Sequence, residues 1–204
     1  GYLDTNPLTG VKPKFILNAR TRFLSMEELA ALWHAAECLS APQKSAFRTL
    51  ILLPLRTGEL LSSGWQNVDR RWLVVPAERT KNNEESYLFI SDFAFSVLQT
   101  PANETDLLFT TNNRTPLVLG TKISVKITAE SGVSNWVYHD IRRTFSTHLN
   151  ERGHPSHIIE ACLNHSDPTR RGVAGVYNRA EYRAAKQMVL QAWSDLVEEA
   201  VSGG

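Results

Sequence analysis

The chain has 204 residues, of which 22 are Lys or Arg and 21 are Asp or Glu, so its formal net charge at pH 7 is only +1. This length suits one domain with a sizeable core, and the longest apolar run, residues 50–55, is far shorter than the roughly 18 residues of a membrane span. The neutral charge balance lacks the basic footprint of a nucleic-acid-binding domain, whose pI usually exceeds about 9, and by itself argues against DNA or RNA as the partner.

Residues 1–22 are predicted to form a linker, because Asn6-Pro7, Gly10 and Pro13 interrupt any helical pattern. We expect one domain over 23–204. Its first helix is predicted to follow a capping box and to span 26–39. A second helix begins after Pro42 and is ended by Pro54.

Residues 72–77 and 86–91 have the composition of strands and are joined by a polar segment whose Asn82-Asn83 suits a turn. Helical patterns are predicted to fill the chain from residue 92 onward, apart from a turn at 112–115. One helix covers 138–152 and is ended by Gly153, the next begins at Pro155 and reaches 163, and the last covers 181–201. The fold class is therefore predicted to be mainly α with one small antiparallel β-sheet (α+β).

The last predicted helix carries an apolar stripe of Val189, Trp193, Leu196 and Val197. Such a stripe packs either on its own domain or on a neighbouring molecule. Cys38 and Cys162 lie far apart and form neither a zinc pair nor a disulfide framework, which favours buried thiols in a reducing compartment. With no secretory leader at its start, the chain is predicted to be a soluble intracellular protein.

The segment HDIRRTFSTHL, residues 139–149, places His139 and Arg142 three apart on one edge of the 138–152 helix. A histidine beside an arginine can grip a phosphate, with the guanidinium supplying paired donors. Taken alone, such a His–Arg pair more often lies on the solvent-exposed edge of a helix and has no specific role. His148 falls on the apolar face of the same helix and is predicted to pack in the core.

Four other residues are candidates. Arg56 follows the Pro54 break, where a loop can aim it into a cleft, and Glu59 could either hold it or face solvent. Lys81 lies at the predicted hairpin tip, where a solvated lysine is the usual interpretation. His165 follows a helix and precedes a glycine-containing segment that leads to Tyr177, which by itself would be taken as a half-buried aromatic residue.

Together, Arg56, Lys81, His139, Arg142, His165 and Tyr177 resemble, in type and order, the active-site set of the tyrosine recombinases, the phage integrase family. WQNVDRRWLVVPAERTKN resembles the family's sheet with its lysine hairpin, HDIRRTFSTHL its H-x-x-R motif, and LNHS with GVYNRAEY its last motif and nucleophile. NPLTGV and FLSMEELAALW are similar to the linker and first helix of prophage and genomic-island integrases. The resemblance covers residues 6–197.

The sequence departs from the family pattern in two places. Pro54 and Leu55 stand where the family commonly has Thr-Gly before its first arginine, although the R-x-x-E-L pattern that follows is kept. The spacer between His165 and Tyr177 is longer than in many members. Tyr182 is therefore a rival nucleophile, and Tyr177 is preferred because VYNRAEY matches the family at that point.

The resemblance implies the tyrosine recombinase catalytic-domain fold and a site-specific DNA recombinase (integrase) that forms a 3′-phosphotyrosine intermediate. Arg56 and Arg142 would clamp the phosphate, with His139 and His165 beside it. Lys81 would protonate the departing 5′ oxygen, and Tyr177 would be the nucleophile. The resemblance implies no cofactor, no metal and no ATP.

The implied partners are double-stranded DNA attachment sites, other integrase protomers in a tetrameric synapse, and an excisionase and a DNA-bending host factor, with no membrane. The resemblance also implies that N-terminal arm-binding and core-binding domains are absent from this sequence and that the protein acts in the bacterial cytoplasm at the nucleoid. C-terminal segments of the family often link protomers.

Three alternative functions remain at the level of sequence. A type IB topoisomerase-like DNA relaxing enzyme uses a similar set of residues, and a non-catalytic DNA-binding module could keep the fold. A His-based metallohydrolase is disfavoured because the histidines do not form an H-E-x-x-H or comparable pattern.

The charges are unevenly distributed along the chain. Residues 11–22 contain Lys12, Lys14, Arg20 and Arg22 and no acid, and residues 139–186 hold eight Lys or Arg against five acids. Residues 187–204 contain acids and neither Lys nor Arg. The small net charge is thus compatible with a local basic DNA face whose affinity is modest and sensitive to salt.

Overall fold

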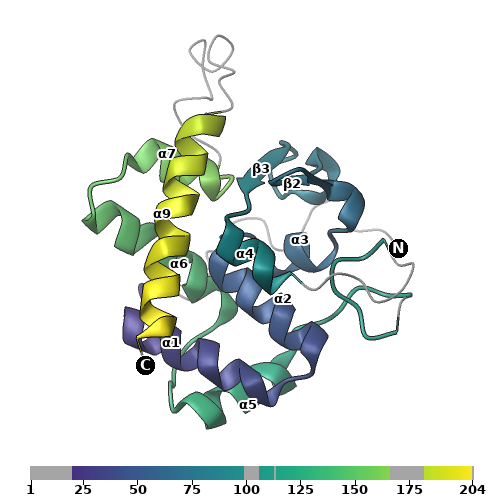
Figure 1. The fold of residues 1–204 in the computed structure, drawn as a ribbon, viewed down its shortest axis with the longest axis vertical. Coiled ribbons are helices and arrows are strands. Elements are labelled where there is room, and N and C mark those ends of the chain that lie inside the picture. The colour runs from purple at the N-terminus through teal and green to yellow at the C-terminus, as the bar shows by residue number, and fades with distance from the viewer. Residues whose placement is uncertain (1–19, 99–105, 113, 166–181, 204) are drawn as a thin grey trace, which may run out of the picture.

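The computed structural model describes residues 20–98, 106–112, 114–165 and 182–203 (Figure 1). It is mainly helical with one small antiparallel sheet, which confirms the predicted fold class. The helices are α1 (Met26–Ala35), α2 (Ala41–Leu52), α3 (Thr57–Leu61), α4 (Asp92–Val97), α5 (Thr121–Ser131), α6 (Tyr138–Glu151), α7 (Ser156–Cys162) and α9 (Arg183–Ser202). The strands are β1 (Val68–Asp69), β2 (Trp72–Val75) and β3 (Ser86–Phe89), and short 3-10 helices cover Ala36–Cys38, Trp65–Asn67 and Ala77–Arg79.

The first helix begins where the sequence predicts, and the second begins at Ala41, two residues before its predicted start. The backbone N–H of Glu28 donates to Ser25 Oγ at 3.2 Å and the Ser25 N–H donates to a Glu28 carboxylate oxygen at 3.0 Å, so both bonds of the capping box form. The predicted 26–39 helix is α1 followed by a 3-10 turn. Helix α2 has Pro42 in its first turn and ends before Pro54, whose ring cannot continue a helix.

The sheet has the order β1-β2-β3, and both pairings are antiparallel. Trp72 lies opposite Phe89 with the two rings edge to face at 5.5 Å, and Leu73 lies opposite Leu88 on the buried face. The sequence predicts the β2–β3 hairpin, whereas β1 is too short to leave a pattern. Figure 1 shows the hairpin beside the upper part of α9, which brings the β2–β3 loop near the end of α7.

The predicted helical fill after residue 92 is wrong for residues 106–111 and 116–120, which form turns and extended chain. The side-chain oxygen of Asn112 accepts the backbone N–H of Thr115 at 3.0 Å, as the predicted turn requires, and the Leu117 N–H donates to the Phe109 carbonyl at 3.1 Å. Local side-chain bonds of this kind compete with the helix.

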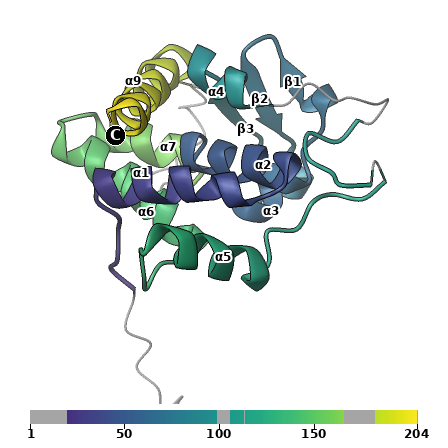
Figure 2. The same ribbon diagram turned by 60° about the horizontal axis from the view of Figure 1, so that its bottom comes forward.

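Helix α9 packs against its own domain, along α1 and α7 and against β3 (Figures 1 and 2). The Trp193 side chain is fully buried, its ring meets Phe145 edge to face at 5.5 Å, and its indole N–H donates to the Ile51 carbonyl at 2.9 Å. Val189 and Val197 are also buried, and Leu196 is half-buried. The predicted stripe is therefore part of the domain's own core.

Of the predicted linker, only residues 20–22 are among the described residues, and two of them bind the domain. The Arg20 guanidinium grips both carboxylate oxygens of Asp140 at 2.8–3.0 Å and donates to the Asn135 carbonyl at 2.6 Å. Arg22 pairs with Glu28 at 2.6 Å. The chain thus enters the domain beside the first turn of α6.

Candidate active site

The first turn of α6 presents His139 and Arg142 in different ways. Asp140 accepts the Val137 N–H at 2.9 Å, which starts the helix and leaves His139 exposed beside it. One turn later, Arg142 is only 4% exposed, so it is a buried side chain rather than part of the solvated rim that the helical wheel allows.

Neutral backbone groups hold the Arg142 guanidinium. One terminal nitrogen, Nη1, donates to the carbonyl of Pro54, and Nη2 donates to the carbonyl of Leu163 at 2.7 Å. Its Nε–H is buried and has no hydrogen-bond partner among the described residues. Burial and, secondarily, the charge of Arg56 lower the pKa of Arg142 to about 10, which still leaves it protonated at pH 7.

Arg56 caps the start of α3 and is held in place by Glu59, whose role the sequence alone does not decide. Glu59 is 5% exposed, accepts Arg56 Nη1 at 2.6 Å and accepts the Arg56 backbone N–H at 3.0 Å. Arg56 itself keeps about a quarter of its side chain exposed. Glu59 therefore holds Arg56 rather than facing solvent. In this position the charge of Arg56 acts on Arg142.

His165 follows α7 and faces both a cation and an anion. Its Nε2 lies 3.5 Å from Arg142 Nη2, and its Nδ1 lies 2.6 Å from a carboxylate oxygen of Glu160. Because a guanidinium only donates, these contacts assign the lone pair to Nε2 and the proton to Nδ1. Glu160 is not among the residues predicted from the sequence. It is joined to His165 by a turn in which the His165 N–H donates to the Glu160 carbonyl at 3.1 Å, and this turn has no distinct sequence signature.

His139 completes the group. Desolvation of the ring, followed by the nearby positive charges of Arg143 and Arg142, lowers the pKa of His139 below its ordinary 6.5. The ring is therefore neutral at pH 7 and able to accept a proton. The structure brings four of the predicted site residues together from three parts of the fold: Arg56 before α3, His139 and Arg142 on α6, and His165 after α7.

Of the other two predicted residues, the structure describes only Lys81. Lys81 is exposed in the β2–β3 loop, and the next residue, Asn82, hydrogen-bonds Asn164, which precedes His165. Tyr177 lies outside the described residues. Its rival Tyr182 is half-buried at the start of α9, with the centroid of its ring 5.8 Å from the centroid of the His157 ring.

Comparison with known proteins gives the family. The sequence profile described as "Phage integrase family" matches residues 22–184. The chain belongs to the phage integrase family. It is 26% identical to "Prophage integrase IntA" of Escherichia coli (strain K12) over 100% of this chain and 51% of that protein. It is 28% identical to "Integrase" of Shigella phage Sf6 over 88% of this chain and 48% of that protein.

The fold is that of a phage integrase. A structure of lambda integrase (75–356), described as a dimer bound to a COC' core site, matches with a TM-score of 0.63 at 17% identity, over 83% of this chain and 66% of that chain. The chain spans about half the length of the curated integrases that it matches.

Other parts of this integrase-family domain have structural roles. His148 Nε2 donates to the Leu24 carbonyl at 2.9 Å and its ring stacks on Trp193, as predicted for a core histidine. Within the described ranges, no three His, Cys, Asp or Glu residues are grouped as metal ligands, and no helix is long and apolar enough to cross a bilayer.

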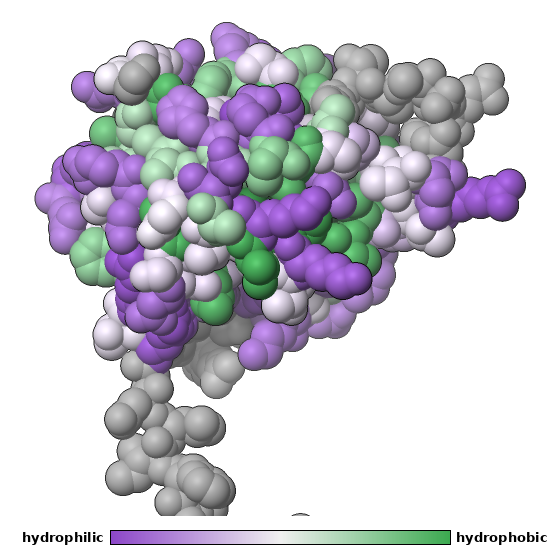
Figure 3. All heavy atoms as spheres, turned by 90° about the horizontal axis from the view of Figure 1, so that it is seen from below, coloured by the Kyte–Doolittle hydropathy of each residue, from purple (hydrophilic) through white to green (hydrophobic). Residues whose placement is uncertain are grey.

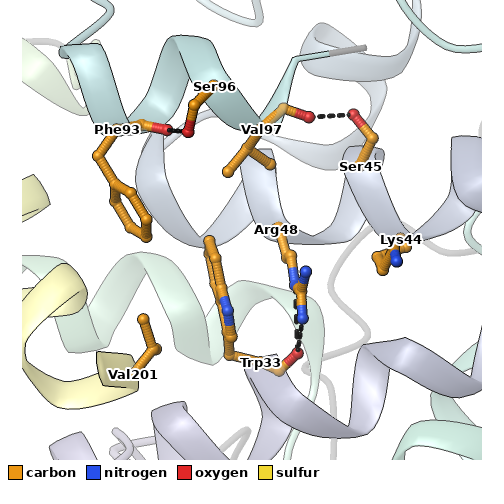
Figure 4. A pocket seen from close by; sticks show the side chains of 8 residues that line it. All are labelled: Trp33, Lys44, Ser45, Arg48, Phe93, Ser96, Val97 and Val201. Atoms are coloured by element: carbon orange, nitrogen blue, oxygen red, sulfur yellow. Dashed lines mark hydrogen bonds between the residues drawn. The ribbon is translucent and has the colours of Figure 1, made fainter. Parts of the chain in front are cut away.

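A hollow of about 410 Å³ lies between α1, α2 and α4 (Figure 4). Trp33 and Phe93 stack across it, Arg48 lies over the Trp33 ring, and Arg48 and Lys44 both pair with Glu37 at its rim. Its cations are already paired and none of the candidate residues lines it. The lower face, seen in Figure 3, mixes apolar and hydrophilic side chains.

Proposed function

We propose that this chain is the catalytic portion of a site-specific DNA recombinase, an integrase that cuts and rejoins DNA strands to integrate or excise a mobile element. The cut strand is held as a 3′-phosphotyrosine on Tyr177. The proposal is supported by family membership and by the cluster around Arg142.

The observation that carries the proposal is the buried Arg142. Its hydrogen bonds to carbonyls orient the guanidinium without cancelling its charge, and the two described acids whose charges act on it, Glu59 and Glu160, are each bound to another side chain. A buried cation without its own counter-ion is a strong site for an anion. A DNA phosphodiester supplies one, and the exposed part of Arg56 leaves access to it.

The chemistry explains why several cations are needed. A tyrosine hydroxyl with a pKa near 10 is about one part in a thousand ionised at pH 7, a deficit of roughly 4 kcal/mol. Arg56 and Arg142 stabilise the charge that develops on the non-bridging oxygens, and each such donor contributes about 10²–10³ in rate. The phosphate lies against His165 Nε2 in place of the Arg142 contact, while Glu160 holds the other ring nitrogen.

Two proton transfers complete the step. The Tyr177 oxygen forms a bond to phosphorus and gives its proton to the neutral His139, while the bond from phosphorus to the 5′ oxygen breaks and that oxygen takes a proton from Lys81. The bond energy is stored in the phosphotyrosine, so resealing on a new strand is the same reaction in reverse.

The proposed partners are double-stranded DNA attachment sites and further copies of this chain in a tetrameric synapse, at the nucleoid of a bacterium. The lambda integrase whose fold matches was solved as a dimer on a core site, which supports both. Residues 1–22 are proposed as the linker from DNA-binding domains, and an excisionase and a DNA-bending factor as accessory proteins.

The test is covalent capture. The protein is incubated in EDTA with a pool of nicked duplexes that carry a randomised central segment, and adducts that survive SDS are isolated, sequenced and mapped by mass spectrometry. We expect a defined sequence, a 3′-phosphate linkage to Tyr177, and no adduct from Tyr177→Phe.

The same assay separates the alternatives. Adducts lost in Tyr182→Phe and kept in Tyr177→Phe would move the nucleophile to Tyr182. Adducts with no sequence preference, together with relaxation of supercoiled DNA by single copies, would indicate a topoisomerase-like activity. DNA binding without any adduct would indicate a non-catalytic module, and cleavage only without EDTA would indicate a metal-dependent enzyme.

A further inference from the structure

An amide pair joins the two loops that carry Lys81 and His165. Asn82 Nδ2 donates to Asn164 Oδ1 at 3.1 Å, and Asn164 Nδ2 donates to Asn82 Oδ1 at 3.1 Å. The two residues are 82 positions apart in sequence, one immediately after Lys81 and the other immediately before His165. Each amide supplies the donor and the acceptor that the other needs, so the pair is satisfied as a unit.

The pair is built into the backbone of both loops. Asn164 Nδ2 also donates to the Glu84 carbonyl at 3.2 Å, and Asn82 Nδ2 lies 3.4 Å from the Asn164 carbonyl. Within the hairpin, Thr80 Oγ1 accepts the Glu84 N–H at 3.1 Å. The tip of the hairpin is thus closed on itself and fastened to the end of α7.

Lys81, in contrast, makes no hydrogen bond or ion pair with any other residue that the structure describes, and its side chain is exposed. Its position depends on the backbone of the hairpin tip alone. Asn82, which is bonded to Asn164, directly follows Lys81 in the chain. The contact that orders Asn82 therefore also limits the positions that the Lys81 ammonium can reach.

The backbone at Asn164 explains which substitution is informative. Its φ is +48°, in the left-handed region that glycine adopts freely and asparagine tolerates better than most residues. Glycine at this position would keep the backbone geometry and remove only the amide. Asn164→Gly therefore tests the contact with little risk to the fold.

We propose that the Asn82–Asn164 pair is a positioning device that holds Lys81 against the phosphate bound by Arg142 and His165. This inference rests on the proposed role of Lys81 as the proton donor to the departing 5′ oxygen. Without the pair, the hairpin tip samples positions from which the ammonium does not reach that oxygen, and a misplacement of about 1 Å in a reacting group can cost on the order of 100-fold in rate.

The experiment compares two leaving groups in the nicked duplex selected by adduct capture. One duplex has the ordinary scissile phosphodiester, and the other has sulfur in place of the bridging 5′ oxygen. A thiolate leaves without a proton, so loss of the proton donor slows only the first. We expect Asn82→Ala and Asn164→Gly to cleave the ordinary duplex about 10–100-fold more slowly at saturating DNA, and the sulfur duplex at the wild-type rate.

Three controls make the result specific. Lys81→Ala should be slowed more on the ordinary duplex and rescued in the same way by sulfur. The double variant Asn82→Ala/Asn164→Gly should be no slower than the slower of the two single variants, because each substitution already breaks the contact that the two amides share. Glu78→Gln, on the same hairpin and exposed, should cleave like the wild type.

The outcomes separate this inference from the function on which it rests. If Lys81→Ala is slowed and rescued while Asn82→Ala and Asn164→Gly cleave at the wild-type rate, the positioning role is wrong and the proposed function stands. If Asn82→Ala and Asn164→Gly cleave slowly and the sulfur duplex does not restore their rate, the positioning role is also wrong, because the pair would then support a group other than Lys81. If Lys81→Ala itself is not slowed, or is not rescued, the role of Lys81 fails and the inference fails with it.

Discussion

Replacing Trp193 by Phe tests whether α9 belongs to its own domain. Trp193 is fully buried, and its indole N–H donates to the carbonyl of Ile51 in the last turn of α2, where helix carbonyls lack partners within the helix. Phenylalanine keeps an aromatic ring against Phe145 but cannot donate this hydrogen bond. The substitution therefore removes one defined bond and part of one buried side chain.

The expected cost is moderate. A buried tryptophan removes about 150–250 Å² from water, which at about 25 cal/mol per Å² is worth roughly 4–6 kcal/mol for the whole side chain. Phenylalanine retains most of that, so a small cavity costs about 1 kcal/mol, and the buried Ile51 carbonyl left without a donor adds about 1–3 kcal/mol. The total is about 2–4 kcal/mol, or a Tm lower by about 5–15 °C for a domain of this size.

The measurement is urea unfolding and thermal melting of the wild type and Trp193→Phe at two protein concentrations a hundredfold apart. Met188→Ala is the matched control, because Met188 lies on the same helix and is 72% exposed, and its substitution should change stability by less than about 0.5 kcal/mol. A loss in Trp193→Phe no larger than that of the control would refute the packing argument. A wild-type Tm that rises with concentration would show that α9 is stabilised by a second copy.

Three further outcomes are expected. Asp140→Asn should destabilise the protein above about pH 4, and urea unfolding from pH 7 to 3 should show its difference from the wild type shrinking as the pH falls. Burial raises the pKa of Asp140, but the hydrogen bonds from Arg20 and Val137 lower it more, so the net pKa lies below its ordinary value. The stability that the carboxylate gives is therefore lost as the pH falls through that lowered pKa. Arg142→Lys keeps the charge but cannot reach two carbonyls at once, so adduct formation should fall at least about 100-fold in a gel assay. Gly153→Ala should lower unfolding free energy by about 1–2 kcal/mol, because Gly153 has a φ of +79° where a Cβ is strained, although nothing lies within 4 Å of it.

Local chemistry made much of the fold predictable. The Ser25 capping box, Pro54 and Gly153 set helix ends through bonds or clashes within a few residues, and the structure places those ends within about two residues of the prediction. The helical prediction for residues 106–111 and 116–120 failed because apolar spacing does not register side-chain bonds such as that of Asn112 to Thr115, in the turn between them. Strand β1 has too few residues to show a period.

The candidate site was predictable in its residue types and not in its partners. A helical wheel places Arg142 at an edge of α6, whereas in the fold the Pro54 and Leu163 carbonyls, distant in sequence, meet over it and bury it. Residue order alone cannot show which backbone carbonyls become available for such contacts. For the same reason, the pair between Asn82 and Asn164 could not be predicted from either loop by itself.

The arrangement of partners also explains how a chain with a net charge of +1 can present a cationic site. Glu59 is bound to Arg56 and Glu160 to His165, while the buried Asp140 is shared between Arg20 and Arg143. Each of these three acids is thus committed to another group, and the guanidinium of Arg142 is bonded to carbonyls that carry no charge. An anion responds mainly to a nearby charge that no other group compensates. In a buried site of low dielectric constant, the attraction between such a charge and the anion is several times stronger than at the surface. A single guanidinium held in this way provides the local field that the overall composition lacks.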